Sequence, residues 1–103
     1  MDNLFKIELT TDRDGTVVQF CGNIDAQAES RLKELPEQVA APLVRMDFSK
    51  AGRINSMGIA LLLRCLKNIR ENCKAEIEVH GLSQVNNMLF KMTGVYLLAQ
   101  PVK

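Results

Sequence analysis

One stretch, residues 51–72, constrains the fold of this chain more than any other. Its apolar residues recur with the spacing of a single helix face, and they are Ile59, Leu62, Leu63, Leu66 and Ile69. Asn55 and Ser56 directly precede this face, and both are residue types preferred at helix N-caps. The run before them, residues 43–48, is almost continuously apolar, as a central strand covered on both faces would be. We therefore predict a strand, a loop and a helix in direct succession.

The first part of the chain shows two strand patterns followed by a helix pattern. Residues 5–9 and 16–21 are separated by a polar turn that ends at Gly15, and together they predict an antiparallel hairpin. Asp25 then occupies a capping position for a helix that Pro36 ends or extends by a short turn.

The last part of the chain alternates between the same two patterns. Residues 75–80 predict a strand with one face in water. Ser83 is expected to cap a helix that stops at Gly94 and whose apolar positions share one face: Val85, Met88, Leu89 and Met92. Residues 95–99 are predicted to form a short strand, and residues 101–103 a frayed tail. The order β-β-α-β-α-β-α-β predicts an α/β fold, with helices packed on a mixed β-sheet through right-handed crossovers.

Length, charge and cysteine usage narrow the function classes. We expect a single domain over residues 1–103. A formal net charge of +1, with four phenylalanines, one tyrosine and no tryptophan, offers neither the basic surface nor the stacking platform of a nucleic-acid-binding protein. No apolar run approaches the roughly 18 residues of a membrane-spanning helix. Three cysteines without CxxC spacing (Cys21, Cys65 and Cys73) favour a reducing, cytoplasmic environment over a disulfide framework.

Few residues could support catalysis. No Gly-x-Ser-x-Gly pattern surrounds Ser56, no phosphate-binding glycine motif occurs, and His80 is the only histidine. With a single histidine, the sequence has few ligands for a metal site of histidine and cysteine. We also expect no cofactor. Cys65 lies among apolar helix residues, which favours packing over reactivity. We therefore expect a protein that is not an enzyme.

Two segments lie at the carboxyl ends of predicted strands, residues 21–25 and residues 47–58. Functional groups in open α/β sheets gather at the carboxyl ends of strands. Ser56 lies in the second segment, at a helix start, where backbone N–H groups and the macrodipole favour negative charge. Two interpretations of Ser56 are open: it caps the helix, or it carries a regulatory phosphate on the helix end.

Four motifs, in order, resemble those of the STAS domains of the small anti-sigma factor antagonist type. Gly22-Asn-Ile-Asp25 is similar to the family's Gly-x-Leu-Asp, and Val44-Arg-Met-Asp-Phe-Ser49 to its Val-x-Leu-Asp-Leu-Ser. Ile54-Asn-Ser-Met-Gly-Ile59 resembles Ile-Asp-Ser-Ser-Gly-Leu. His80-Gly-Leu-Ser83 with Thr93-Gly94 follows the family's closing pattern. The resemblance covers most of the chain.

The resemblance implies a bacterial signalling protein that regulates transcription by partner switching. The unphosphorylated domain would bind a GHKL-type serine kinase or anti-sigma factor, which phosphorylates the serine that corresponds to Ser56. Phosphorylation releases the domain, and a PP2C-type phosphatase restores it. The expected partner-binding surface consists of Asp25, Ser49, Asn55, Ser56, Met57 and Gly58. Two alternatives stay open: a non-phosphorylated STAS subunit with a structural role in a transporter or signalling assembly, and a sensor of a small ligand or nucleotide.

Two features depart from the family pattern. Asn55 replaces the usual aspartate before the serine, which removes a carboxylate beside the phosphate acceptor but keeps a capping side chain. Many members continue into a further helix, whereas this sequence ends soon after Gln100. We expect the surface under such a helix to be bare, which favours a homodimer.

Overall fold

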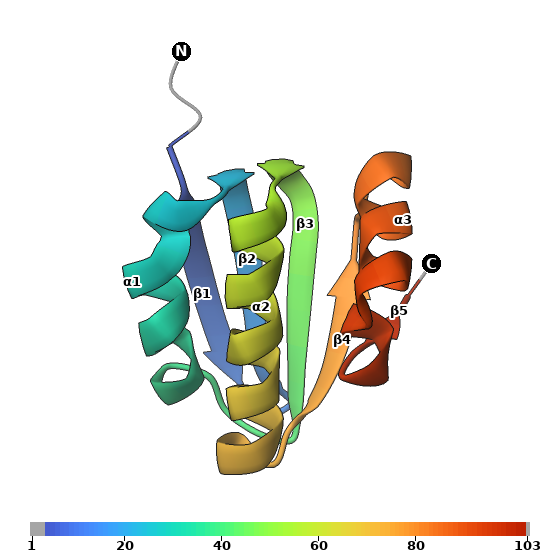
Figure 1. Cartoon of the computed structure of the whole chain (residues 1–103). Coiled ribbons are helices and arrows are strands. Elements are labelled where there is room, and N and C mark those ends of the chain that lie inside the picture. The colour runs from blue at the N-terminus through green and yellow to red at the C-terminus, as the bar shows by residue number, and fades with distance from the viewer. Residues whose placement is uncertain (1–3, 103) are drawn as a thin grey trace.

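The computed structural model describes residues 4–102 and places three α-helices on one face of a five-stranded β-sheet (Figure 1). The strands are β1 (Lys6–Asp12), β2 (Gly15–Ile24), β3 (Leu43–Ile54), β4 (Glu76–His80) and β5 (Gln100–Pro101). The helices are α1 (Glu29–Glu34), α2 (Ser56–Asn68) and α3 (Gln84–Thr93). Short 3₁₀ turns, Ala26–Ala28 and Leu35–Glu37, flank α1, and a π-helical turn, Ile69–Cys73, extends α2. Over residues 4–102, none of the helices has the length and apolar character needed to span a membrane.

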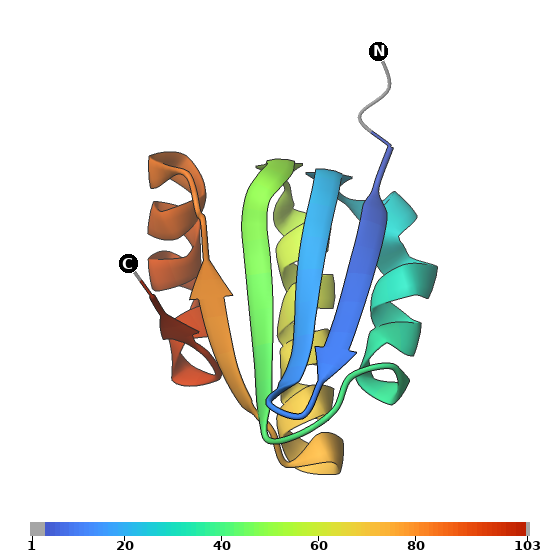
Figure 2. The ribbon, with the colours of Figure 1, turned by 180° about the vertical axis from the view of Figure 1, so that it is seen from behind.

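The sheet is mixed, as predicted, and its strands lie in chain order from β1 to β5. β1 and β2 pair antiparallel through a turn that joins Asp12 to Gly15, and every later pair is parallel. Crossovers of one hand that step in one direction pass over the same face of a sheet. The helices therefore share one face, and in Figure 2 the opposite face of β1–β4 carries no helix of the described residues.

Aromatic side chains join the sheet to the helices in a common core. Phe20 and Phe48 stack with ring centroids 4.6 Å apart, and Phe90 of α3 meets Phe48 edge-on at 5.3 Å. Leu62 and Leu66 of α2 are buried in the same core.

β3 is longer than predicted. It runs to Ile54 rather than ending at Phe48, because its second half continues along β2 through two register shifts. Ile24 pairs with Ile54 beyond the second shift. The small and polar residues of this half, Ser49–Arg53, do not show an apolar strand pattern.

β3 is also covered on one face only, so the prediction of a strand buried on both faces is wrong. Val44, Met46 and Phe48 point into the core, whereas Arg45 and Ser49 are exposed. The apolar run predicted the strand correctly, but the handedness of the crossovers left its second face open.

The strand predicted at residues 95–99 is wrong. Val95–Leu97 form a 3₁₀ turn, and Val95 and Ala99 are both buried. The N–H of Ala99 donates to the carbonyl of Val95 at 3.1 Å, and Leu97 is 87% exposed. A strand would instead place residues 95, 97 and 99 on the same face.

The last strand lies further along the chain, at Gln100–Pro101. Pro101 is tolerated because β5 is an edge strand, where one backbone N–H is dispensable. The N–H of Val102 donates to the carbonyl of Val79 at 2.9 Å, so the chain is held to the sheet through Val102 and is not frayed there. Lys103 lies outside the described residues.

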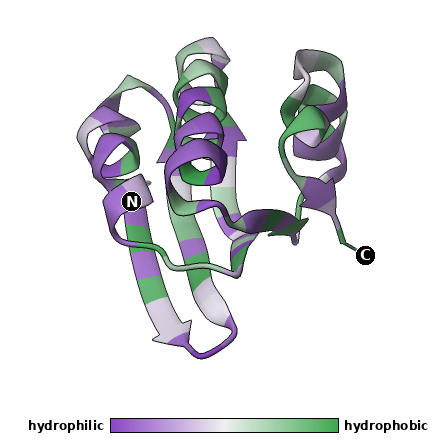
Figure 3. Ribbon diagram, turned by 90° about the horizontal axis from the view of Figure 1, so that it is seen from below, coloured by the Kyte–Doolittle hydropathy of each residue, from purple (hydrophilic) through white to green (hydrophobic). Residues whose placement is uncertain are grey.

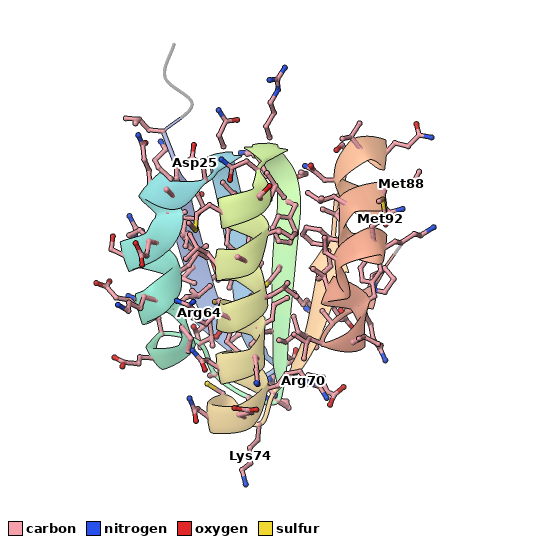
Figure 4. All side chains as sticks on the ribbon, viewed as in Figure 1. Asp25, Arg64, Arg70, Lys74, Met88 and Met92 are labelled. Atoms are coloured by element: carbon pink, nitrogen blue, oxygen red, sulfur yellow. The ribbon has the colours of Figure 1, made fainter. Side chains whose placement is uncertain are left out.

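α3 has the predicted ends but not the predicted buried face. The hydroxyl of Ser83 accepts the N–H of Asn86 at 3.1 Å, which confirms the cap, and Gly94 ends the helix in the left-handed conformation. The side chains that α3 buries are Asn86 and Phe90. The predicted apolar positions are exposed or half-buried: Val85 is 77% exposed, Met88 56% and Met92 77%, and Leu89 is half-buried (Figure 4).

Candidate functional site

The carboxyl ends of β2 and β3 bring the candidate residues to one end of the molecule. Asp25 directly follows β2, and Asn55 is the single residue between the end of β3 and Ser56, which begins α2. Figure 4 shows Asp25 at the end of the molecule where α2 begins. Residues that lie 31 positions apart in the sequence are therefore neighbours in one polar region.

Asn55, not Ser56, caps α2. Asn55 has an extended backbone (φ −93°, ψ −177°), and its Oδ1 accepts the N–H of Gly58 at 2.8 Å. The carbonyl of Asn55 accepts the first helical hydrogen bond, from the N–H of Ile59 at 2.9 Å. Ser56 is therefore the first helical residue, and the interpretation of Ser56 as the cap is wrong. Because Asn55 makes the cap bond, the exposed Ser56 hydroxyl is not needed for it.

Gly58 allows α2 to start in contact with the end of β2. A Cβ at Gly58 would lie 2.0 Å from the carbonyl oxygen of Ile24, closer than any side chain could be accommodated. The same carbonyl accepts the N–H of Asn55 at 3.2 Å. Gly58 is buried, so it supports the Ser56 surface from beneath and does not form part of it. Met57 is 51% exposed and lies beside Ser56 at the helix start.

Asn23 joins the ends of β2 and β3, a role that the sequence analysis missed. Its Oδ1 accepts the N–H of Arg53 at 2.9 Å, across the second register shift between the strands. That oxygen would lie 2.2 Å from a Cβ at Gly52, so only glycine leaves room for it. Asn23 occupies the variable position of the Gly22-Asn-Ile-Asp25 motif, but nothing in the sequence indicated that it would bind Arg53.

Asn86 connects this region to α3. Its Nδ2 donates to the carbonyl of Gly52 at 3.1 Å, although the two residues are far apart in the sequence. An open groove runs between the end of β3 and the start of α3, and its lining residues are Asn23, Ala51, Gly52, Arg53, Ser83, Val85 and Asn86. Asn86 is polar and lies outside the apolar face predicted for α3, so its buried contact was not predicted.

Asp25 and Ser49 have different surroundings from Ser56. Asp25 is half-buried and caps the 3₁₀ turn that follows it, because its Oδ1 accepts the N–H of Gln27 at 3.0 Å. Ser49 is exposed within β3, and its N–H donates to Asp47 Oδ1 at 2.9 Å. The structure therefore brings Asp25, Asn55, Ser56 and Met57 to one end of the molecule, whereas Ser49 lies within β3.

Asp47 is held in its ionised form. Partial burial alone would raise the pKa of its carboxyl group. The hydrogen bonds from Ser49 and Gln19, together with the charge of His80, outweigh burial and hold the pKa below its ordinary value. The bond from Gln19 Nε2 to Asp47 Oδ2 measures 3.3 Å. These contacts tie β2, β3 and the end of β4 together, so we assign Asp47 a structural role.

Cys65 is a packing residue, as predicted. It is buried in α2, and burial raises the pKa of its thiol to about 12. The thiolate that would act as a nucleophile is therefore scarce at neutral pH.

The start of α2 presents the hydroxyl of Ser56 to solvent. It is exposed at the first position of a 13-residue helix, where the end of the macrodipole is positive. Phosphate groups are favoured at such ends by the free N–H groups and by the dipole.

Comparison with known proteins supports the fold. No protein-family model and no curated protein matches the sequence. The anti-sigma factor antagonist SpoIIAA in its unphosphorylated form superposes with a TM-score of 0.71 at 16% identity, over 97% of this chain and 89% of that one. The phosphorylated form of SpoIIAA, described as a Bacillus cell fate determinant, gives 0.64 at 16% identity, over 97% and 92%. An antisigma-factor antagonist STAS domain from Rhodobacter sphaeroides gives 0.59 at 14% identity, over 76% and 87%.

These similarities at low sequence identity establish the architecture. The mixed sheet with helices packed on it agrees with the fold predicted from the order of elements. The chain has the fold of the STAS-domain anti-sigma factor antagonists.

Proposed function

We propose that this chain is a phosphorylation-controlled binding protein of the anti-sigma factor antagonist type, with Ser56 as the modified residue. This proposal rests on the different roles of two neighbouring residues at the start of α2. Asn55 makes the cap bond, and Ser56 presents its hydroxyl to solvent one residue later. The similarity to a protein that has been solved in unphosphorylated and phosphorylated forms supports the same reading.

The helix end can accept a phosphate without losing its structure. Phosphorylation adds a charge of about −1.5 to −2 at neutral pH. The macrodipole favours a negative charge at this position by about 0.3–1 kcal/mol. A partner pressed against the same surface would instead meet a bulky, hydrated dianion. Modification therefore acts on binding and leaves the fold in place.

The proposed contact surface is small and mixed in character. Asp25, Asn55 and Ser56 contribute polar groups, and Met57 contributes an exposed apolar side chain next to the hydroxyl. A serine kinase of the GHKL type, acting as the anti-sigma factor, is the proposed partner for the unmodified surface, and a PP2C-type phosphatase would reverse the modification. Asn55 lacks the charge of aspartate, so this partner must recognise the site without a carboxylate there.

The alternative is a non-phosphorylated subunit with a structural role in a larger assembly. Exposed apolar residues on α3, Val85, Met88 and Met92, favour it, because a permanent interface buries such side chains. In that case substitutions at Ser56 would leave partner binding unchanged.

Affinity purification from the source cells with two bait proteins separates the two functions. The Ser56→Ala bait should retain a GHKL-type kinase, and the Ser56→Asp bait should lose it. Ser30→Asp, which adds the same charge at an exposed position of α1, is the control and should behave like the wild type. Identical partners on the Ser56→Ala and Ser56→Asp baits would contradict the switch and favour the structural subunit.

A further inference from the structure

Among residues 4–102, no strand pairs with the outer side of β1, which forms one edge of the sheet (Figure 2). Its seven residues, Lys6–Asp12, pair with β2 on one side only, in a register without a bulge. Such an edge presents a row of free backbone N–H and C=O groups that another strand can bind. The opposite edge differs, because β5 has only two residues and one of them is Pro101.

The free backbone groups belong to alternate residues of β1. In an antiparallel pair, the N–H and C=O of one residue both point to the partner strand, and those of the next residue both point away. The carbonyl of Ile7 accepts a hydrogen bond from Arg31 Nη2 of α1 at 3.4 Å, so Ile7 points outward. Leu9 and Thr11 lie two and four residues after Ile7, so their backbone N–H and C=O groups also point away from β2. A carbonyl oxygen has two lone pairs, so Arg31 does not prevent Ile7 from accepting a second bond.

The residues of β1 alternate in hydropathy along the strand (Figure 3). Because successive side chains of a strand point to opposite faces, the two faces of β1 differ in character. Ile7 packs against the core on the helix side, and Leu9, on the same side, is 37% exposed. Lys6, Glu8 and Asp12 alternate with them and are exposed on the opposite face. β1 therefore begins with a basic residue, Lys6, and ends with an acidic residue, Asp12.

We propose that β1 pairs antiparallel with β1 of a second copy of this chain, about a twofold axis through Leu9. Ile7 then faces Thr11 of the second copy and Leu9 faces itself, so the outward backbone groups of both strands are hydrogen-bonded. Lys6 lies opposite Asp12 of the second copy, and the symmetry repeats this pair. Opposite charges at facing positions stabilise paired strands. The two sheets become one continuous sheet.

Other registers that pair outward groups with outward groups fit less well. An axis through Glu8 places Glu8 opposite itself, and an axis through Thr10 places Glu8 opposite Asp12. Like charges at facing positions destabilise paired strands. An axis through Ile7 pairs Lys6 with Glu8 but leaves the end of the strand without a partner. The axis through Leu9 uses the whole strand and places no like charges opposite each other.

Amide hydrogen exchange of the full chain, followed by NMR at increasing protein concentration, tests the pairing residue by residue. The N–H groups of Ile7, Leu9 and Thr11 should become protected as concentration rises, in parallel with a monomer–dimer transition in sedimentation. The N–H groups of Glu8 and Thr10, which point to β2, should be protected throughout. A protein that stays monomeric, or a dimer whose outward β1 amides exchange as fast as in the monomer, would overturn the proposal.

A charge reversal with a matched control tests the register. Lys6→Glu places two carboxylates opposite each other at both ends of the pair and should raise the dimer Kd about two- to thirtyfold, the range for two cross-strand pairs. Lys6 faces Cys21 within its own chain, so the hairpin loses no charge pair. Lys50→Glu makes the same change in net charge on β3, away from the edge, and should leave the Kd unchanged. An equal effect of the two substitutions would contradict the Leu9 register.

A third variant removes the charge pair from its acidic side. Asp12→Asn keeps an Oδ1 acceptor for the N–H of Asp14, a bond of 2.8 Å that supports the hairpin turn. It should weaken the dimer less than Lys6→Glu, because it removes attraction without adding repulsion. A stronger effect than that of Lys6→Glu would contradict the proposed pairing. None of these outcomes bears on Ser56, which lies on a different surface of the chain.

Discussion

α2 and α3 have similar sequence patterns and different environments. Both carry apolar residues at helical spacing, and both begin with a side-chain cap, Asn55 for α2 and Ser83 for α3. α2 buries its apolar stripe, with Leu62 and Leu66 almost fully inaccessible. α3 instead leaves Met92 and other members of its stripe in solvent.

The difference follows from where each helix lies on the sheet. α2 lies over the middle of the sheet and packs against α1, so its stripe is enclosed from several directions (Figure 1). α3 covers the β4–β5 end, where no further helix of the described residues flanks it, and Phe90 is its main anchor in the core. Periodicity therefore identifies a helix, whereas its neighbours decide which face is buried.

The largest contrast is expected from truncating one apolar side chain in each helix. Leu62→Ala should cost about 2–5 kcal/mol of unfolding free energy, because it leaves a cavity in the core. Met92→Ala should change the unfolding free energy by no more than about 0.5 kcal/mol, since the side chain is mostly in solvent. Urea unfolding measures both. Similar losses for the two variants would mean that α3 is covered in solution.

Gly58 gives a smaller contrast between two positions of α2. Gly58→Ala should destabilise the protein by about 1–3 kcal/mol, because the new methyl group collides with the carbonyl of Ile24. In an unhindered helix the same change would stabilise by about 1 kcal/mol. The reverse change at the exposed Ala60, Ala60→Gly, should cost only about 1 kcal/mol. A stabilised Gly58→Ala protein would refute the close contact between α2 and β2.

Removing either helix cap should cost a similar unfolding free energy, whereas truncating the apolar residues of the two helices should not. Asn55→Ala and Ser83→Ala each remove a bond to a free helical N–H and should each cost about 0.5–2 kcal/mol. Asn55→Asp keeps an acceptor and should leave the unfolding free energy close to the wild-type value. If Asn55→Ala were neutral, Asn55 would not be the cap.

Ser56 should give the smallest effect on stability. Ser56→Asp adds a negative charge at the start of α2, and the dipole should stabilise the protein by about 0.3–1 kcal/mol. Chemical unfolding at low ionic strength measures this change, and added salt should reduce it. A loss of more than about 2 kcal/mol would show that the helix start does not tolerate the charge, because surface substitutions normally change stability far less.

Local patterns were enough to predict most elements of the fold. The alternation at residues 75–80 and the helical spacing of residues 59–69 depend on neighbours in sequence, and both predictions were confirmed. The second half of β3 was missed because Ser49–Arg53 are held by pairing with β2, a contact that a local pattern does not contain. The same limit applied at residues 95–99, where burial of Val95 and Ala99 depends on distant parts of the chain.

The candidate site could be predicted only in part. Its position at the ends of β2 and β3 followed from the order of elements, and Asp25 and Asn55 are caps, as their residue types indicated. Which of Asn55 and Ser56 caps α2 required the backbone geometry, because both residue types suit the position. The links from Asn23 to Arg53 and from Asn86 to Gly52 join segments that are distant in sequence, so no spacing revealed them.

Intact-mass analysis of the protein purified from its own cells, with fragment mapping of any added phosphate, tests whether Ser56 is phosphorylated. We expect a single phosphate, located on Ser56 and absent from a Ser56→Ala variant expressed in the same cells. An unmodified protein across growth conditions in which its kinase is active, or a phosphate at another residue, would contradict Ser56 as the switch.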